Sequence, residues 1–224
     1  LVGFPGTGVV GSVAASQILD NLEMDFVGYI SSPTFAPLAA IHDYMPQPPV
    51  RIHFSQEHNL ILVIAEMSVP INTSLELAEK IFEFAKSVGA SEIVSLGGIS
   101  MKEDENAVYV VASDRKFSKA LTGKKNVKQI REGATTGVIG IILAKGVLEN
   151  FPVVSILAEA SQDYLDPRAA ANALRILSDY LGIPMDTSRL EKEAKELSQT
   201  VKEAVIKSKI SKKEGGGSPG SMYG

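Results

Sequence analysis

Cysteine and tryptophan are absent from the 224 residues of this chain. Without cysteine there is no disulfide, no thiolate metal site and no cysteine nucleophile. Such a chain suits a reducing cytosol, although secreted proteins can also lack cysteine, and we expect a cytoplasmic protein. Long apolar runs are absent as well. A membrane-spanning helix needs roughly 18 apolar residues, whereas the longest run covers Val138 to Leu143 and is flanked by glycines.

An excess of either charge is also lacking. The 22 basic and 26 acidic residues leave a net charge of −4, which gives no reason to expect nucleic acid or an anionic membrane as a partner. Hydrophobic residues make up 45% of the chain and charged residues 21%, as in globular proteins with a hydrophobic core. The length fits one large domain, or one domain with an appendage.

Short runs rich in β-branched residues alternate with helical segments. This pattern predicts an α/β domain whose parallel or mixed sheet is covered by helices. Two predominantly apolar runs, Leu60–Ala65 and Val153–Ala158, should be central strands buried on both faces. The dipeptide Leu1-Val2 is expected to belong to a first strand that begins before Leu1. The predicted strands are Phe26–Ser31, Val50–His53, Leu60–Ala65, Glu92–Leu96, Val108–Ala112 and Val153–Ala158.

Capping signals mark two helices of this domain. Thr73 and Glu76 have the spacing of a capping box, and Gly89 follows the last turn of that helix. Asp166-Pro167 is predicted to cap and open a later helix, which ends at Gly182. The predicted buried faces are Leu75, Ala78, Phe82 and Ala85 in the first helix, and Ala170, Leu174, Leu177 and Leu181 in the second.

A third helix is predicted from Ser188, which has capping-box spacing with Glu191. Its narrow apolar stripe can pack on the chain's own domain or on another subunit. We expect a core domain over residues 1–186, an amphipathic helix over 187–211 and a flexible glycine-rich tail over 212–224. The stripe consists of Leu190, Ala194, Leu197, Val201 and Ala204.

Gly6 to Gly11 fits the G-x-G-x-x-G pattern of dinucleotide sites, in which glycines let the backbone approach a pyrophosphate. The confirming acidic residue is missing from the far end of the second strand, and no lysine follows the glycines. We therefore favour a tight turn with close helix–sheet packing. The second glycine-rich turn, Glu132 to Gly140, and the pair Gly97-Gly98 can either cradle an anion or allow close packing, and we favour packing for the turn.

The three histidines, His42, His53 and His58, lack the spacing of metal ligands. A metal site would require the fold to gather them with Asp43 or Glu66. We expect ordinary hydrogen-bonded or surface histidines instead, and neither a metal nor another cofactor. No serine lies in a G-x-S-x-G elbow, and the sequence predicts no catalytic residue.

Two segments are candidates for protein contact. The segment from Asp43 to Pro49 contains three prolines, and its Tyr44 and Met45 would form a contact surface if exposed or a plug if buried. The chain ends in Met222-Tyr223-Gly224 after a flexible leash, so an apolar side chain, a tyrosine and a carboxylate can reach one pocket together. The glycine-rich leash also resembles an artificial linker.

Several of these segments together resemble archaeal members of the proteasome-assembly-chaperone family, homologues of the eukaryotic assembly chaperones. The opening motif runs from Gly3 to Ser12. Later landmarks follow in the family's order, so that the resemblance extends from Leu1 to about Leu190. They are Pro48 to Arg51, Leu96 to Ile99, Glu132 to Gly140, and Asp166 to Ala170.

The resemblance implies a three-layer αβα domain with nucleoside-phosphorylase-like architecture and no known catalytic function. It also implies oligomers that engage the α-ring of the 20S proteasome, as assembly factors or ATP-independent activators. Proteasome activators often end in a hydrophobic residue, a tyrosine and any residue, and Met222-Tyr223-Gly224 matches that pattern.

We therefore predict a non-enzymatic, homo-oligomeric and ring-like proteasome chaperone or adaptor, which binds the 20S α-ring through Met222, Tyr223 and Gly224. Two alternatives stay open. One is a binder or enzyme for a nucleotide or nucleoside-like small molecule, using the glycine-rich loops. The other is an assembly module for a paralogous chaperone, with its tail sequestered.

Overall fold

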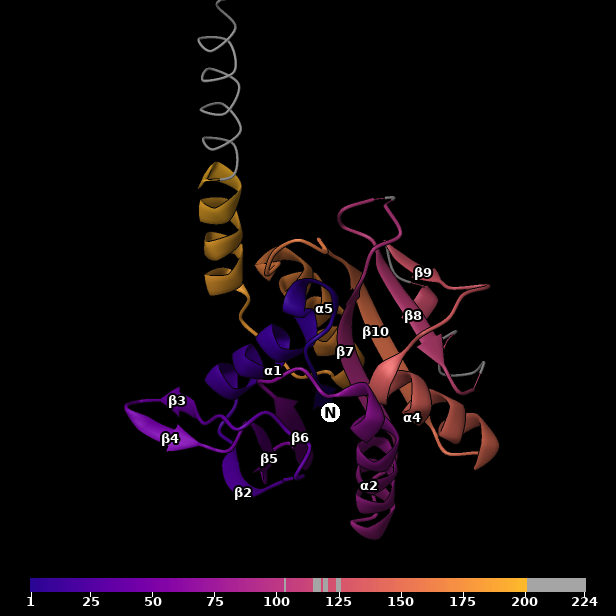
Figure 1. The fold of residues 1–224 in the computed structure, drawn as a ribbon. Helices are drawn as coiled ribbons and strands as arrows, with labels where there is room; N and C mark the ends of the chain where they lie inside the picture. Colours follow the sequence, from indigo (N-terminus) through magenta and orange to yellow (C-terminus); the bar gives the residue numbers. More distant parts are fainter. Residues whose placement is uncertain (103, 115–117, 119–120, 124–125, 201–224) are drawn as a thin grey trace, which may run out of the picture.

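The computed structural model describes residues 1–102, 104–114, 118, 121–123 and 126–200 (Figure 1). Over these residues the chain forms the predicted α/β domain, in which helices cover both faces of one mixed sheet. In the described part of the chain, no helix is long and apolar enough to cross a membrane.

An eight-stranded sheet forms the middle layer. Its strands are β1 (Val2–Gly3), β2 (Asp25–Tyr29), β5 (Val50–Ser55), β6 (Leu60–Ala65), β7 (Ile93–Ile99), β8 (Val108–Ala112), β9 (Val127–Gln129) and β10 (Val153–Glu159). The strand order is β2-β5-β6-β1-β7-β10-β8-β9. The central strands β6, β1, β7 and β10 are mutually parallel, whereas β5 and β2 continue the sheet antiparallel on one side and β8 runs antiparallel to β10 on the other. Central strands buried on both faces explain the apolar runs of β6 and β10.

Helices pack in pairs on the two faces of the sheet (Figure 1). One face carries α1 (Val10–Asn21), which follows the short 3-10 helix η1 (Thr7–Val9), together with α5 (Pro167–Leu181). The other face carries α2 (Ser74–Ser87), which follows the 3-10 helix η2 (Ile71–Thr73), together with α4 (Gly137–Leu148). The result is the three-layer αβα arrangement expected from the sequence.

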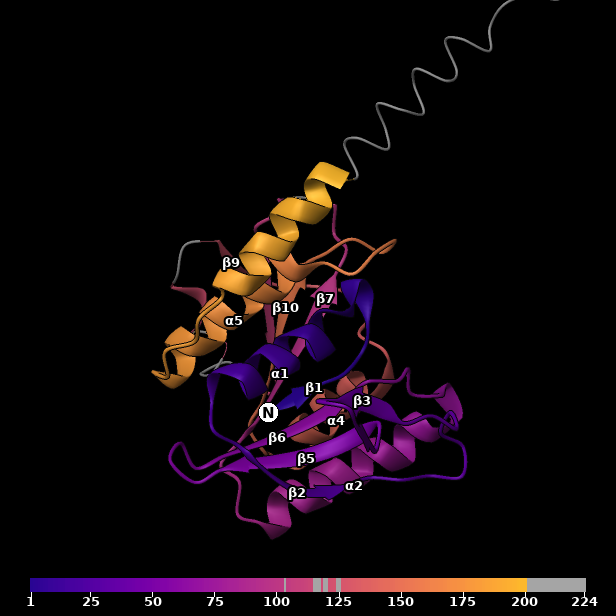
Figure 2. The same ribbon diagram turned by 90° about the vertical axis from the view of Figure 1, so that its left-hand side faces the viewer.

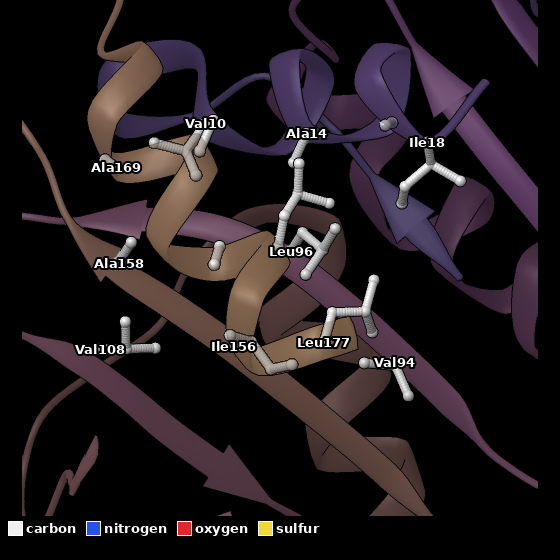
Figure 3. Packing of buried hydrophobic residues seen from close by; sticks show 14 of the residues in the cluster. Val10, Ala14, Ile18, Val94, Leu96, Val108, Ile156, Ala158, Ala169 and Leu177 are labelled. Carbon is white, nitrogen blue, oxygen red and sulfur yellow. The ribbon is translucent and has the colours of Figure 1, made fainter. Parts of the chain in front are cut away.

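Small side chains bring α1 and α5 close to the sheet. Figure 3 shows Val10 and Ala14 of α1 facing α5 above the strands β7 and β10. Alanines dominate the buried face of α5, which lets its backbone approach the strands, while Leu174 and Leu177 fill the remaining space. This layer and the separate cluster under α2 and α4 form the two main parts of the core.

A last helix covers residues 188–200 and leaves the domain after its first turn (Figure 2). Leu190 is fully buried in the α1–α5 layer, whereas Ala194 and Leu197 are only partly covered. Two ion pairs hold the base of this helix on the domain: Arg189 lies 2.5 Å from Asp20, and Glu191 lies 2.6 Å from Arg175. Among the described residues of the predicted stripe, Leu190 is packed on its own domain, whereas Ala194 and Leu197 are only partly covered.

The six predicted strands are confirmed, with small shifts at their ends. The later helix is also confirmed: Asp166 accepts a hydrogen bond from the Ala169 N–H at 3.1 Å, Pro167 opens the helix, and Gly182 ends it with a φ of 68°. Leu181 of its predicted face is only partly buried. Strands β1, β9 and the hairpin strands described below were too short to be predicted fully.

Both predicted capping boxes are wrong. The Thr73 hydroxyl bonds the Thr34 hydroxyl and does not cap α2. Ser188 donates its N–H and its hydroxyl to Asp186 Oδ1, at 2.9 and 2.6 Å, and the Glu191 carboxylate accepts the Thr187 hydroxyl at 2.9 Å instead of pairing with Ser188. Leu75 is also misplaced, being 57% exposed, because α2 buries Leu77 and Ile81 beside the predicted Ala78, Phe82 and Ala85.

Candidate functional sites

A cavity of about 760 Å³ lies at the carboxyl ends of β1, β7 and β10. In open parallel sheets, ligands bind at this edge of the strands. The glycine-rich segments noted in the sequence all reach it, although they lie far apart along the chain. We call it the glycine-lined cavity; residues 4–7, 68–69, 96–101 and 130–139 contribute to its wall, among others.

Two buried carboxylates fix loops beside this cavity. Glu159, at the end of β10, accepts hydrogen bonds from the backbone N–H groups of Met101 and Lys102, at 3.1 Å each. Asp166 accepts the backbone N–H of Ser161 at 3.1 Å. Charge-assisted hydrogen bonds of this kind are stronger than neutral ones, so the loops at 100–102 and 160–166 are held in defined positions.

The glycines of the first segment serve close packing. An added Cβ on Gly11 would lie 2.3 Å from the carbonyl oxygen of Phe4, and one on Gly3 would lie 2.5 Å from that of Gly11. Gly98 is equally tight, because a Cβ there would lie 2.1 Å from the Thr7 carbonyl oxygen. The predicted packing role is confirmed at Gly11, and at Gly98, which the sequence left open, the geometry also favours packing; Gly6 has nothing within 4 Å of an added Cβ. Val9, a β-branched residue, adopts a φ of +54°, a strained conformation that occurs often at functional sites.

The second glycine-rich segment is built differently. Added Cβ atoms on Gly133 and Gly137 would have few neighbours. The one on Gly133 would come no closer than 3.6 Å to Ile130, and the one on Gly137, which has a φ of +69°, would face open space. Only Gly140 is tight, at 2.4 Å from the Thr135 carbonyl oxygen. Thr136 stands at the N-cap of α4, and its side chain does not cap the helix. Packing therefore explains the end of this segment, and its beginning lines the cavity.

A separate hairpin projects from the domain (Figure 1). It consists of β3 (Ala40–His42) and β4 (Met45–Gln47). Asp43 and Tyr44 form its turn with φ values of 48° and 64°, as in two-residue turns of type I′. Tyr44 is 99% exposed and Met45 63% exposed. The alternative in which these side chains plug a loop is therefore wrong, and the contact-surface interpretation fits their positions.

A buried ion cluster attaches this hairpin to the sheet. Arg51 of β5 is 2% exposed, and its Nη1 lies 2.6 Å from Glu66 Oε2. The His42 Nε2 atom of the hairpin lies 2.9 Å from the same carboxylate and 3.3 Å from Arg51 Nη2. Because a buried guanidinium needs its carboxylate partner, the Arg51–Glu66 pair is fixed, and the half-exposed His42 ties the base of the hairpin to it.

The histidines do not form a metal site. His42 lies at the end of β3 and belongs to the Arg51–Glu66 cluster. His53 is buried beneath the ring of Phe26, with ring centroids 5.8 Å apart, and burial followed by the positive charge of Arg51 lowers the pKa of His53. Within the described ranges, no three His, Cys, Asp or Glu side chains gather closely enough to hold a metal ion.

The predicted docking residues Met222, Tyr223 and Gly224 lie outside the described residues, as do Val201 and Ala204 of the predicted stripe. The docking role of the first three residues and the place of the last two in the apolar stripe stay predictions.

Comparison with known proteins decides the family. The profile of the PAC2 family matches residues 1–205. The chain belongs to the PAC2 family. A curated PAC2-like relative, the uncharacterised protein MJ0106 of Methanocaldococcus jannaschii, is 31% identical over 201 residues, which cover 89% of this chain and 82% of the relative.

Two solved structures place this PAC2 chain among archaeal proteins. It is similar to Pyrococcus furiosus PbaA, an archaeal homologue of proteasome-assembly chaperone, with 29% identity, a TM-score of 0.82 and coverage of 95% of this chain and 89% of PbaA. It is also similar to Pyrococcus furiosus PbaB, an archaeal proteasome activator, with 26% identity, a TM-score of 0.77 and coverage of 91% of each chain. The resemblance recognised in the sequence is confirmed.

Two features of the PAC2 domain escaped prediction from the sequence. The Arg51–Glu66–His42 cluster joins residues from β3, β5 and the loop after β6, and the spacing of these residues in the sequence does not predict it. The meeting of the glycine-rich segments at one cavity was not predicted either, although each segment carried its own signal.

Proposed function

We propose that this PAC2 protein is a homo-oligomeric assembly chaperone or ATP-independent adaptor of the proteasome, and that it acts by binding rather than by catalysis. The observation that carries the proposal is the likeness of the whole domain to PbaA and PbaB, which extends over at least 91% of this chain. Their described roles supply the partner class, and the sequence supplies a means of contact.

The proposed contact with the α-ring of the 20S core is the C-terminal tripeptide. Met222 provides an apolar side chain, Tyr223 a ring with a hydroxyl, and Gly224 a carboxylate without a side chain. These groups are suited to a pocket that ends in a lysine or in backbone N–H donors. One such tripeptide binds weakly, so several copies on one oligomer would gain from their effective concentration.

The proposed subunit contact is the helix that begins at residue 188. Its stripe leaves the domain after Leu190, and Ala194 and Leu197 stay partly exposed at described positions of that helix. An apolar stripe that is buried at Leu190 and partly exposed at Ala194 and Leu197 is suited to packing against the same helix of a neighbouring subunit.

The hairpin offers a second contact surface. Ile41, Tyr44 and Met45 are each more than 60% exposed, and the tyrosine stands at the tip. Tyrosine at the centre of an interface often contributes much of the binding energy. Since the ion cluster fixes the hairpin's base, a partner would meet a preorganised surface.

The test of the tail mechanism compares the full chain with a variant lacking residues 222–224. Light scattering after size-exclusion chromatography gives the oligomer mass, and binding to purified archaeal 20S cores is measured in parallel. We expect the truncation to abolish 20S binding and to leave the number of subunits in the oligomer unchanged. A matched control deletes Gly215, Gly216 and Gly217, which shortens the leash by the same length and keeps the last three residues.

Undiminished 20S binding by the truncated chain would contradict the tail mechanism. Binding to a paralogous PAC2 chain, without binding to the 20S core, would favour the assembly-module alternative. For the subunit contact, Leu197→Glu should reduce the oligomer mass. Gln199→Glu adds the same charge at an exposed position of the same helix and should not.

A further inference from the structure

The proposed function makes no use of the glycine-lined cavity. Its volume of about 760 Å³ lies within the range of about 300–1,000 Å³ that is usual for small-molecule sites. It stands at the carboxyl ends of parallel strands, where α/β sheets bind ligands. Glu159 holds the 100–102 loop against it from outside. The cavity therefore has the size, the position in the fold and the fixed wall that are typical of a ligand-binding site.

A buried pair of hydroxyls lies at the cavity floor. Ser95 of β7 and Ser155 of β10 are 1% and 0% exposed, and their Oγ atoms are 2.9 Å apart in a hydrogen bond that Ser95 donates. Neither hydroxyl has another hydrogen-bond partner among the residues described. Two hydroxyls carry two protons, and their mutual bond uses one, so the Ser155 proton is left without an acceptor. Ser155 borders the cavity floor without being open to water, whereas Ser95 does not border it, so a ligand must pack directly against the floor to reach the Ser155 hydroxyl. A buried donor of this kind requires an acceptor, which a ligand in the cavity would supply.

The charges around the cavity select against a charged ligand. Arg131 and Glu132 are the charged residues in its described lining, and their side chains are 95% and 87% exposed at the rim, 4.0 Å from each other. Because the two charges are opposite and close together, their electrostatic effects on a ligand in the cavity largely cancel. A ligand bearing a full charge would therefore lose water on entering without gaining an ionic partner inside, which is unfavourable.

The floor favours a flat ring. Gly97 leaves the backbone of β7 without a side chain there; Leu157 lies beside it on β10, and Val111 adds apolar surface beside Ser155. Thr7, Ser68 and Ser100, which carry hydroxyl groups, also line the cavity. A planar ring can lie on the apolar floor while its polar substituents bond hydroxyls of the lining.

We propose that the glycine-lined cavity binds an uncharged heteroaromatic compound with carbonyl and hydroxyl groups, of the nucleoside class. A ring acceptor takes the hydrogen bond of Ser155, the ring lies over Gly97, and the sugar-like hydroxyls reach the rim. The lining of this site includes neither the proposed docking tripeptide nor residues 188–200, and the inference does not depend on the proposed function.

The test uses the full chain with adenosine, inosine and uridine as probes. Thermal unfolding is followed with each nucleoside up to millimolar concentration, and calorimetry gives the Kd. We expect at least one nucleoside to raise the Tm, because a ligand that binds only the folded state stabilises it. Its 5′-monophosphate should bind at least tenfold more weakly, and maltose, which has hydroxyls but no aromatic ring, should not bind.

Two variants connect binding to this cavity. Ser155→Ala removes the unused donor and should raise the Kd about tenfold, equivalent to one lost hydrogen bond. Ser178→Ala is the matched control, since the Ser178 hydroxyl donates to the Ile183 carbonyl oxygen at 2.7 Å on the α5 side of the sheet.

Gly133→Trp fills the cavity from a position with free space and should abolish binding. Gly123→Trp, at a position with equal space outside the cavity, should bind as the unmodified chain does.

The proposal is overturned if none of the three nucleosides shifts the Tm, or if the monophosphate or maltose binds more tightly than they do. Unchanged affinity in Gly133→Trp would also overturn it, even if Ser155→Ala fails to fold. The chain without residues 222–224 should keep its nucleoside affinity. Loss of 20S binding and loss of nucleoside binding are therefore distinguishable outcomes.

Discussion

The two glycine-rich segments of this chain have similar sequences and different physical roles. In the segment from Gly3 to Gly11, Gly3 and Gly11 are required because backbone atoms stand where a Cβ would be, whereas Gly6 has open space and lines the cavity. In the segment from 132 to 140, Gly133 and Gly137 border a cavity and have room around them. A glycine-rich motif therefore indicates either close packing or an open loop, and only the neighbouring backbone decides between them.

The largest effect should come from Gly11→Ala. The added methyl group would lie 2.3 Å from the Phe4 carbonyl oxygen and 2.6 Å from that of Leu96, and backbone atoms cannot move aside as flexible side chains do. We expect a loss of about 3 kcal/mol in the free energy of unfolding, measured by urea denaturation. A loss below about 1 kcal/mol would remove the distinction between the two segments.

The next largest effect is expected for Glu159→Gln. The amide keeps the shape of the side chain but has one oxygen to accept the backbone N–H groups of Met101 and Lys102, and its NH₂ group faces donors. A loss of about 2 kcal/mol is expected, because hydrogen bonds to buried charged groups are among the stronger ones. Glu57→Gln, at an exposed turn, serves as the control and should be neutral. Equal behaviour of both variants would mean that the 100–102 loop is not held by Glu159.

Asp166→Ala should have a smaller effect. Asp166 caps α5 through the Ala169 N–H, and its own N–H donates to the Gly8 carbonyl oxygen at 2.9 Å. The substitution removes the cap and the hydrogen bond from the Ser161 N–H but keeps the backbone bond to Gly8, so we expect a loss of about 1.5 kcal/mol. Asp166→Asn keeps a capping oxygen and should recover most of this loss in the same denaturation experiment. Without such recovery, the ion pair with Arg168, at 2.9 Å, would be the more important contact.

The smallest effect is expected for Gly133→Ala. Its Cβ would come no closer than 3.6 Å to Ile130, which is ordinary van der Waals contact. The change in unfolding free energy should stay within about 0.5 kcal/mol, as for surface substitutions away from special features. A loss as large as that of Gly11→Ala would show that both segments are packed alike, contrary to the geometry described above.

Local signals predicted most of the fold. The β-branched runs gave the positions of the longer strands, and Asp166-Pro167 with Gly182 marked α5 because a cap, a fixed φ and a left-handed terminus depend on neighbouring residues only. The capping boxes failed for the opposite reason. Thr73 found a hydrogen-bond partner in Thr34, far along the chain, and the spacing of Thr73 and Glu76 contains no information about that residue.

The candidate sites were predictable only in pieces. Each glycine-rich segment was visible in the sequence, but their meeting depends on the order in which β1, β7 and β10 stand in the sheet. The hairpin was missed because Asp43-Tyr44 is not a usual turn dipeptide; both residues are held at positive φ by the strands around them. Its exposure, which favours a contact surface, could be decided only in three dimensions.

The place of β1 has a consequence for how the protein folds during synthesis. Val2 pairs with Val63 on one side and with Ser95 on the other, so the strand at the middle of the sheet leaves the ribosome long before either neighbour. Closing such long loops is entropically unfavourable and slow compared with local pairing. The β5–β6 hairpin can form early, whereas Val2 and the tightly packed turn behind it wait until β7 has been made. The centre of the sheet is therefore completed late, and substitutions at Gly3 or Gly11 should slow this final step of folding.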